Sequence, residues 1–202
     1  MKLAFLGDVY DHWKGSIIDL LGDTLNNLHV VPLLTDAENW TEDHFRVYAL
    51  LLRVDADCIL RKRCNFEKLR ESRYQYFAEL AGPSREGVTE SCDLFLDPDT
   101  GIGKRDRSHV WRDDIDQLLQ ASGSRILLIY THEDRGASEV DALNTMRKAF
   151  GESRFFAYRS AKQHLSMAFV GRDECRLTRA RARFSSVLGP VAAERLIGQV
   201  AE

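Results

Sequence analysis

The sequence predicts a three-layer α/β protein in which a mostly parallel sheet ends in an antiparallel hairpin. The segment 125–130 is an almost unbroken apolar run, which is typical of a parallel strand covered by helices on both faces. A helical pattern separates it from the apolar run 93–96, so the two runs form a β-α-β unit. The strand-like segments 154–158 and 165–170 are joined by a short polar loop, which predicts the hairpin.

Length and composition place the chain among single-domain globular proteins. It has 202 residues, of which 44% are hydrophobic and 29% charged, and only 4 prolines, which excludes a disordered or low-complexity protein. We expect one α/β domain over 1–202, with a helical insertion at about 42–81. The net charge of -3 excludes a wholly basic nucleic-acid binder.

Nothing in the sequence indicates a membrane or a secretion route. No stretch approaches about 18 apolar residues in a row, the length that a membrane span needs. The chain reaches the acidic Asp8 without a signal-peptide pattern. The 4 cysteines are scattered without C-x-x-C spacing, as expected of reduced thiols. We therefore expect a cytoplasmic protein that does not contact membranes.

The first half of the chain is mainly helical in pattern. Apolar spacing predicts helices over 8–21, 42–52 and about 66–80, and a strand over 30–34. Pro32 lies inside that strand and cannot donate to a sheet ladder, so the strand belongs at an edge or at a bulge. Residues 1–6 fit either a short strand or the lead-in to a helix.

The second half alternates strands and helices more regularly. Helices are predicted between 110 and 119 and over 138–150, and Gly123 and Gly151 end them. Two closing helices are predicted over 176–188 and 191–200, separated by a Gly-Pro pair. These elements complete the layers around the sheet.

The turn Asp97-Pro98-Asp99-Thr100-Gly101 is the strongest candidate site, because it directly follows the buried strand 93–96. Ligands of open α/β sheets bind where strands end. Proline fixes one backbone torsion and glycine permits torsions that other residues resist, so the turn would aim both carboxylates into a cleft. Asp97, Pro98 and Asp99 are therefore candidate catalytic residues. The alternative is a plain turn with two solvated acids.

His132 is a further candidate catalytic residue at the end of the next central strand. Parallel strands end at one edge of a sheet, so this position would place His132 beside Asp97. A structural histidine is the alternative.

Four polar residues of the first half are candidates for binding a cofactor. Asp8, Asp11 and His12 share a helix face if the helix starts there, with Lys14 slightly off that face, since positions three and four apart are neighbours. The alternative makes Asp8 an N-cap, Asp11 a partner of the helix dipole and Lys14 a solvated charge. Asp36 follows the strand 30–34 and would face the same cleft, unless it belongs to a plain acidic loop.

A basic stripe near the C-terminus indicates a possible contact with nucleic acid. Arg176, Arg179 and Arg183 recur at helical spacing and would form a row that meets phosphates. The alternative is a solvated helix face. The sequence does not indicate an oligomeric state.

Several well-defined catalytic signatures are missing from the sequence. It contains no Walker A, G-x-S-x-G or H-E-x-x-H motif, and no Cys/His zinc spacing. No G-x-G-x-x-G loop follows an early strand, which argues against a standard dinucleotide site.

The second half of the chain resembles class I S-adenosylmethionine-dependent methyltransferases, which have a Rossmann-like fold whose sheet ends in an antiparallel hairpin. Amino-methylating members carry a D/N-P-P-Y/F motif at the end of the fourth strand, where Asp97-Pro98-Asp99-Thr100 stands here. The opening Gly7-Asp8-x-x-Asp11-x-x-Lys14 resembles the Gly-Asn-x-x-Asp-x-x-Lys opening of adenine-N6 ribosomal RNA methyltransferases. The chain also resembles uncharacterised bacterial proteins that pair such an opening with a central LDPD-x-G segment.

This resemblance implies S-adenosylmethionine as the cofactor and nucleic acid as a substrate. By the same resemblance, Asp97 would hold the acceptor's amino or hydroxyl group and Asp36 would bind the cofactor's ribose. The sequence departs from the family at two places. Asp99 and Thr100 replace the second proline and the aromatic residue, and no glycine-rich loop stands near the strand 30–34.

Two other functions fit the same residues. Asp8, Asp11, Asp97 and Asp99 could bind Mg²⁺ or Mn²⁺ for phosphodiester hydrolysis, as in a nuclease, because hard cations prefer oxygen ligands. The chain could also be a non-catalytic binding module on a methyltransferase-like fold.

Overall fold

A computed structural model describes residues 1–61, 66, 69, 73–81, 92–103, 109–132, 139–160, 165–190 and 195–197. Its centre is a mixed sheet with the strand order β1-β2-β3-β5-β4-β6. The strands are β1 (His29–Pro32), β2 (Leu94–Asp97), β3 (Ile126–His132), β4 (Phe155–Arg159), β5 (Leu165–Gly171) and β6 (Leu196–Ile197). The pairs among β1, β2 and β3 are parallel, and all later pairs are antiparallel. The predicted α/β class and the antiparallel C-terminal pair are confirmed.

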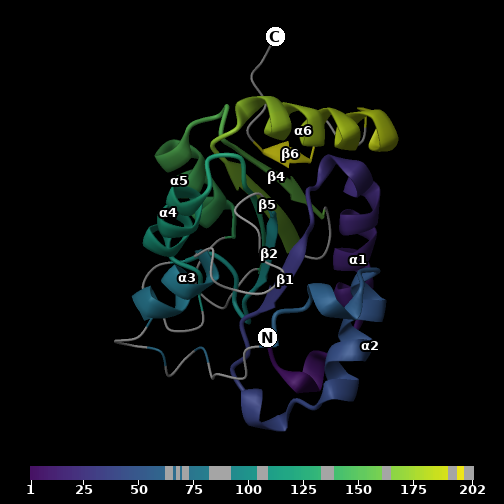
Figure 1. Ribbon diagram of the computed structural model, residues 1–202. Helices are drawn as coiled ribbons and strands as arrows, with labels where there is room; N and C mark the ends of the chain where they lie inside the picture. The colour runs from purple at the N-terminus through teal and green to yellow at the C-terminus, as the bar shows by residue number, and fades with distance from the viewer. Residues whose placement is uncertain are drawn as a thin grey trace.

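Helices cover both faces of the sheet (Figure 1). The α-helices are α1 (Val9–Leu21), α2 (Glu42–Leu52), α3 (Arg73–Ala81), α4 (Arg112–Ala121), α5 (Glu139–Phe150) and α6 (Glu174–Leu188). Helices α1, α2 and α6 pack on one face, and α3, α4 and α5 on the other.

Strand alternation divides the core into two parts. Phe95 and Leu128 pack toward α1, α2 and α6, whereas Leu94 and Leu127 pack toward the opposite helices. Successive side chains of a strand point to opposite faces. A polar residue at a strand end therefore belongs to one face only, and its position in the alternation decides which.

The first half agrees with the predicted elements except at the start of α3. Of the two alternatives for residues 1–6, the structure shows the lead-in to a helix, since Leu3–Phe5 form a short 3₁₀ helix ahead of α1. Strand β1 is the edge strand that Pro32 indicates. Helix α3 begins at Arg73, later than predicted, and Leu69 is not helical. The N–H of Phe66 donates to the carbonyl of Leu34, and the N–H of Leu69 donates to the carbonyl of Phe66.

The predicted closing helix over 191–200 is wrong where the structure describes that segment. Leu196 and Ile197 form strand β6, which pairs antiparallel with β4. Without this pairing the outer edge of β4 would expose unpaired backbone groups. Sheet completion therefore overrides the helical pattern.

Two further observations bear on the expected class of protein. Within the described ranges, no helix has the length and apolar content needed to cross a bilayer. Cys58, Cys92 and Cys175 are free thiols, and Cys64 lies outside the described residues.

Candidate functional site

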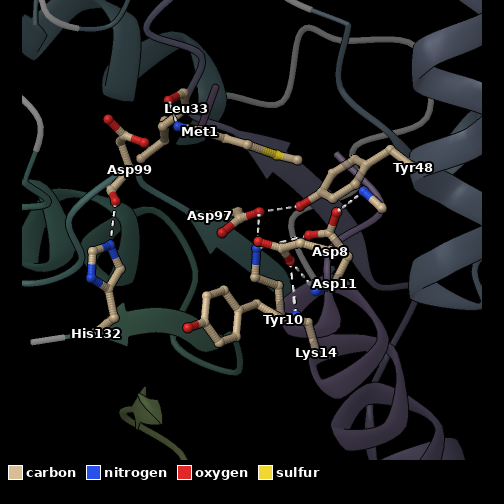
Figure 2. Close-up of polar contacts among 11 residues, drawn as sticks. Met1, Asp8, Tyr10, Asp11, Lys14, Leu33, Tyr48, Asp97, Asp99 and His132 are labelled. Atoms are coloured by element: carbon tan, nitrogen blue, oxygen red, sulfur yellow. Dashed lines mark hydrogen bonds and ion pairs between the residues drawn. The ribbon is translucent and has the colours of Figure 1, made fainter. Parts of the chain in front are cut away.

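A buried lysine between two carboxylates forms the centre of the site (Figure 2). The Nζ atom of Lys14 lies 3.1 Å from Oδ1 of Asp11 and 2.9 Å from Oδ2 of Asp97. The side chains of Lys14, Asp11 and Asp97 are 6%, 1% and 1% exposed. The structure thus brings together three residues that the sequence nominated from two distant segments.

The start of α1 sets this geometry. Asp8 caps the helix, since its Oδ1 accepts the N–H groups of Tyr10 at 2.8 Å and Asp11 at 3.2 Å. The N–H of Gly7, whose φ is 86°, donates to Oδ2 of Asp11 at 2.9 Å. Asp8 is therefore a cap, as the simpler interpretation held, while Asp11 and Lys14 turn into the protein.

Two tyrosines complete the network, and the sequence did not nominate either. The hydroxyl of Tyr48 on α2 donates to Oδ2 of Asp97. The ammonium of Lys14 lies 4.3 Å from the ring centroid of Tyr130 on β3, a cation–π contact. Both tyrosines continue apolar patterns of their own elements, so no local signal marked them.

One oxygen of Asp97 is unused. Lys14 and Tyr48 both contact Oδ2, and Oδ1 has no hydrogen-bond donor among the described residues. In Figure 2 this second oxygen points away from Lys14 and Tyr48. Two carboxylates share the ammonium of Lys14. The α-amino group of Met1 also interacts with the charge of Asp97, but burial lowers the pKa of that amine to about 6. An additional donor or positive charge would therefore stabilise the cluster.

Burial and charge together determine how the cluster titrates. Burial alone would lower the pKa of Lys14, but the carboxylates of Asp97 and Asp11 outweigh it, and the pKa is raised. Desolvation raises the pKa of Asp11 against the opposing effect of Lys14. Desolvation also raises the pKa of Tyr48 and of Tyr130, and Asp97 adds to both shifts. Lys14 is thus held as a cation and is unsuited to act as a base.

The rim of the site is formed by Asp99 and its neighbours. Oδ2 of Asp99 lies 3.0 Å from Nζ of Lys2, and the backbone carbonyl of Asp99 contacts Nε2 of His132. His132 therefore lies beside Asp99, not beside Asp97 as expected. Figure 2 shows this pair apart from the lysine cluster.

The expectation that the turn aims both carboxylates outward is wrong for Asp97. Asp97 is still the last residue of β2, so it follows the strand alternation and shares the face of Phe95 under α1 and α2. Pro98 is buried, and Asp99, past the end of the strand, reaches the rim. Only Asp99 behaves as a turn carboxylate.

Asp36 does not fit the role of a ribose-binding residue. Both of its oxygens accept the N–H of Leu3, at 3.2 and 3.0 Å, and Oδ1 also accepts the indole N–H of Trp40 at 3.1 Å. Asp36 holds the N-terminal segment against β1. A cofactor hydroxyl would have to compete with these bonds.

The predicted arginine stripe is wrong at Arg176. Its guanidinium is buried and contacts Asp93 through Nη1 at 3.1 Å and Nη2 at 2.6 Å. Arg179 and Arg183 are exposed, and Nε of Arg183 donates to the carbonyl of Leu20. The spacing places Arg176 on the buried face of α6, where Leu177 and Ala180 also pack.

The site gives no support to a metal ion. Among the described residues, no group of three or more His, Cys, Asp or Glu side chains is arranged to bind one. The ammonium of Lys14 occupies the position between Asp11 and Asp97 where a cation would lie.

Comparison with known proteins adds no assignment. No protein-family model, no curated protein and no solved structure matches the chain. The function therefore has to be inferred from the site itself.

Proposed function

We propose that the protein is a methyltransferase-like α/β domain that binds the amino group of a nucleobase at the carboxyl end of β2. The observation that carries this proposal is Oδ1 of Asp97, which has no hydrogen-bond donor among the described residues while Lys14 and Tyr48 hold the other oxygen in place. A fixed, desolvated carboxylate oxygen accepts a hydrogen bond from an N–H donor strongly.

The order of the strands supports the methyltransferase-like part of the proposal. Strand β5 runs antiparallel between β3 and β4, so the parallel strands continue into an antiparallel hairpin, as the family resemblance implies. Asp97 ends the strand at which that resemblance places the acceptor-binding motif. Fold likeness alone does not establish a reaction.

The described residues fit S-adenosylmethionine poorly. Asp36, the candidate ribose ligand, is engaged by Leu3 and Trp40, and the segment after β1 contains no glycine-rich loop. The proposed amino-group site does not depend on binding of this cofactor.

The residues of the cluster would act by positioning. Lys14 and Tyr48 hold Oδ2 of Asp97, which orients Oδ1, and Asp11 holds Lys14 from the other side. An amino group at Oδ1 would be fixed in orientation with its nitrogen lone pair free of the carboxylate. Such positioning is the main contribution that a group-transfer site of this kind makes.

Adenosine and purine riboside, which lacks the amino group, test the amino-group site. We expect the wild-type protein to bind adenosine about 10- to 100-fold more tightly in calorimetry, since a hydrogen bond to a charged group stabilises by about 1.5–3 kcal/mol. In Asp97→Asn, Lys14 attracts the amide oxygen and turns the NH₂ group toward the ligand, so the preference should vanish. Asp19→Asn, an exposed change on α1, should keep it.

Equal affinity of the wild-type protein for the two nucleosides would reject the amino-group site. A titration with S-adenosylmethionine in metal-free buffer then separates enzyme from binding module. Micromolar binding that Asp97→Ala abolishes supports methyl transfer. No heat at millimolar ligand, together with a retained adenosine preference, supports a non-catalytic binding module.

A further inference from the structure

We propose that a second site, on the opposite face of the same sheet edge, binds a tetrahedral oxyanion such as phosphate. It consists of a row of four residues whose side chains carry hydrogen-bond donor groups: Thr131, Ser166, Arg159 and Arg195. The proposal does not depend on the amino-group site.

The sheet register places these residues in one row. Ser166 on β5 pairs directly with Thr131 on β3 and with Arg159 on β4. The N–H of Arg159 donates to the carbonyl of Arg195 at 3.1 Å, which continues the pairing of β4 with β6. Side chains of directly opposed residues are neighbours, with Cβ atoms about 4.5–5.5 Å apart.

The row lies on the face away from Lys14 and Asp97. Ile129, Ala168 and Ala157 precede or follow the row by two residues on their strands, and all three belong to the core under α3, α4 and α5. Strand alternation therefore gives the row the same face. The network around Lys14 belongs to the other face, where Tyr130 packs.

The two hydroxyls of the row are available to donate. The Oγ atom of Ser166 is buried and has no hydrogen-bond partner among the described residues. Oγ1 of Thr131 accepts the N–H of Ile102 at 3.3 Å, which leaves its own proton to donate. A buried hydroxyl without a partner destabilises a protein unless a ligand or another group satisfies it.

The two arginines supply positive charge next to these hydroxyls. Arg159 and Arg195 are half-buried, and Nε of Arg159 is buried. Arg195 forms no ion pair with any residue that the structure describes. Guanidinium forks and hydroxyls are the side-chain donors that match phosphate oxygens.

Thermal unfolding in phosphate tests the site. At constant pH and ionic strength, replacing chloride with phosphate should raise the Tm of the wild-type protein in a saturable way, because a ligand of the folded state stabilises it. We expect Arg195→Gln and Ser166→Ala to lose most of this rise. The matched control Arg172→Gln removes an exposed arginine that follows the far end of β5, and it should keep the full rise.

Ser166→Ala also distinguishes a binding role from a structural one. With chloride alone its Tm should equal or exceed that of the wild type, because the change removes an unpaired hydroxyl. A lower Tm in chloride would assign the hydroxyl a structural bond and overturn the proposal. So would a phosphate effect in the wild type no larger than that of chloride, or a full phosphate effect in Ser166→Ala.

A competition experiment shows whether the oxyanion that binds to the row belongs to a nucleic-acid backbone or is a free anion. If a dinucleotide phosphodiester displaces inorganic phosphate, as followed by the phosphorus-31 linewidth, the row accepts a nucleic-acid backbone. If it does not displace phosphate, the row accepts the free anion. Either result retains the oxyanion site.

Discussion

Asp93 directly precedes strand β2 and Asp97 ends it, and the two carboxylates differ in how completely they are hydrogen-bonded. Asp93, just before the strand, is fully buried and accepts bonds from Arg176, from the N–H of Asn26 at 2.7 Å and from the N–H of Ile126 at 2.7 Å. Asp97, its last residue, shares Lys14 with Asp11, and no described residue donates to its Oδ1.

The difference separates a structural ion pair from a candidate site. At Asp93 one carboxylate faces one guanidinium, and both of its oxygens are satisfied. At Asp97 two buried carboxylates share one lysine, and Oδ1 has no donor within the described part of the chain, which stability alone does not favour. Burial and an ion pair are common to both aspartates and so do not distinguish a candidate site. The incomplete hydrogen bonding of the Asp97 carboxylate does.

The largest expected effect comes from removing the central lysine. Lys14→Met leaves two buried carboxylates without a cation and should lower the free energy of unfolding by about 3–5 kcal/mol in urea denaturation. Arg176→Met leaves one carboxylate that keeps two backbone donors, so it should cost less. A larger destabilisation by Arg176→Met than by Lys14→Met would contradict the excess of carboxylates that we assign to the Asp97 end.

Neutralising Asp93, whose two oxygens are both hydrogen-bonded, should have the next largest effect on the free energy of unfolding. Asp93→Asn leaves Arg176 buried without its counter-charge and weakens charged hydrogen bonds, at an expected cost of about 1.5–3 kcal/mol. Urea denaturation measures it. A cost near zero would show that Asp93 is not the structural pair described above.

Alkaline pH should destabilise the Asp97 end through three groups. The pKa values of Lys14, Tyr48 and Tyr130 are all raised in the folded protein, so above pH of about 10 the unfolded chain loses protons that the folded protein retains. The stability that these three groups contribute should be intact below that pH and fall as pH rises further. Urea midpoints measured between pH 8 and 11 test this, because the ordinary pKa of tyrosine, about 10, lies within that range.

Tyr48→Phe is the control for the pH dependence. It removes one of the groups with a raised pKa, so its stability should decline less steeply above pH of about 10. An unchanged slope would mean that Tyr48 titrates equally in the folded and unfolded protein.

The smallest effect is expected for Asp97→Asn. Asp11 still neutralises Lys14, and the amide oxygen still accepts from Lys14 and Tyr48, so the cost should stay below about 1 kcal/mol. The same substitution at the two ends of one strand thus compares the two aspartates directly. A loss of several kcal/mol at Asp97 would make it a structural residue like Asp93.

Several features of the site follow from local sequence. The cap at Asp8 and the shared face of Asp11 and Lys14 depend on spacings of three residues within one helix, which sequence alone can read. Gly101 has a φ of 91°, and a Cβ atom there would lie 2.1 Å from Oγ1 of Thr131. The glycine of the turn is therefore required both by its torsion and by close packing.

The sequence by itself determined the α/β class, the extent of α2, the parallel strands, and the helix face that carries Asp11 and Lys14. Only the tertiary structure decided which carboxylates pair with the buried Lys14 and Arg176. The contacts of Lys14 with Asp97 and of Arg176 with Asp93 each join residues 83 positions apart. The periodicity of the sequence indicates which residues share a face of a helix or strand. Whether a charged side chain can be buried depends on which groups distant in the sequence pair with it. Those pairs form only when the helices pack on the sheet.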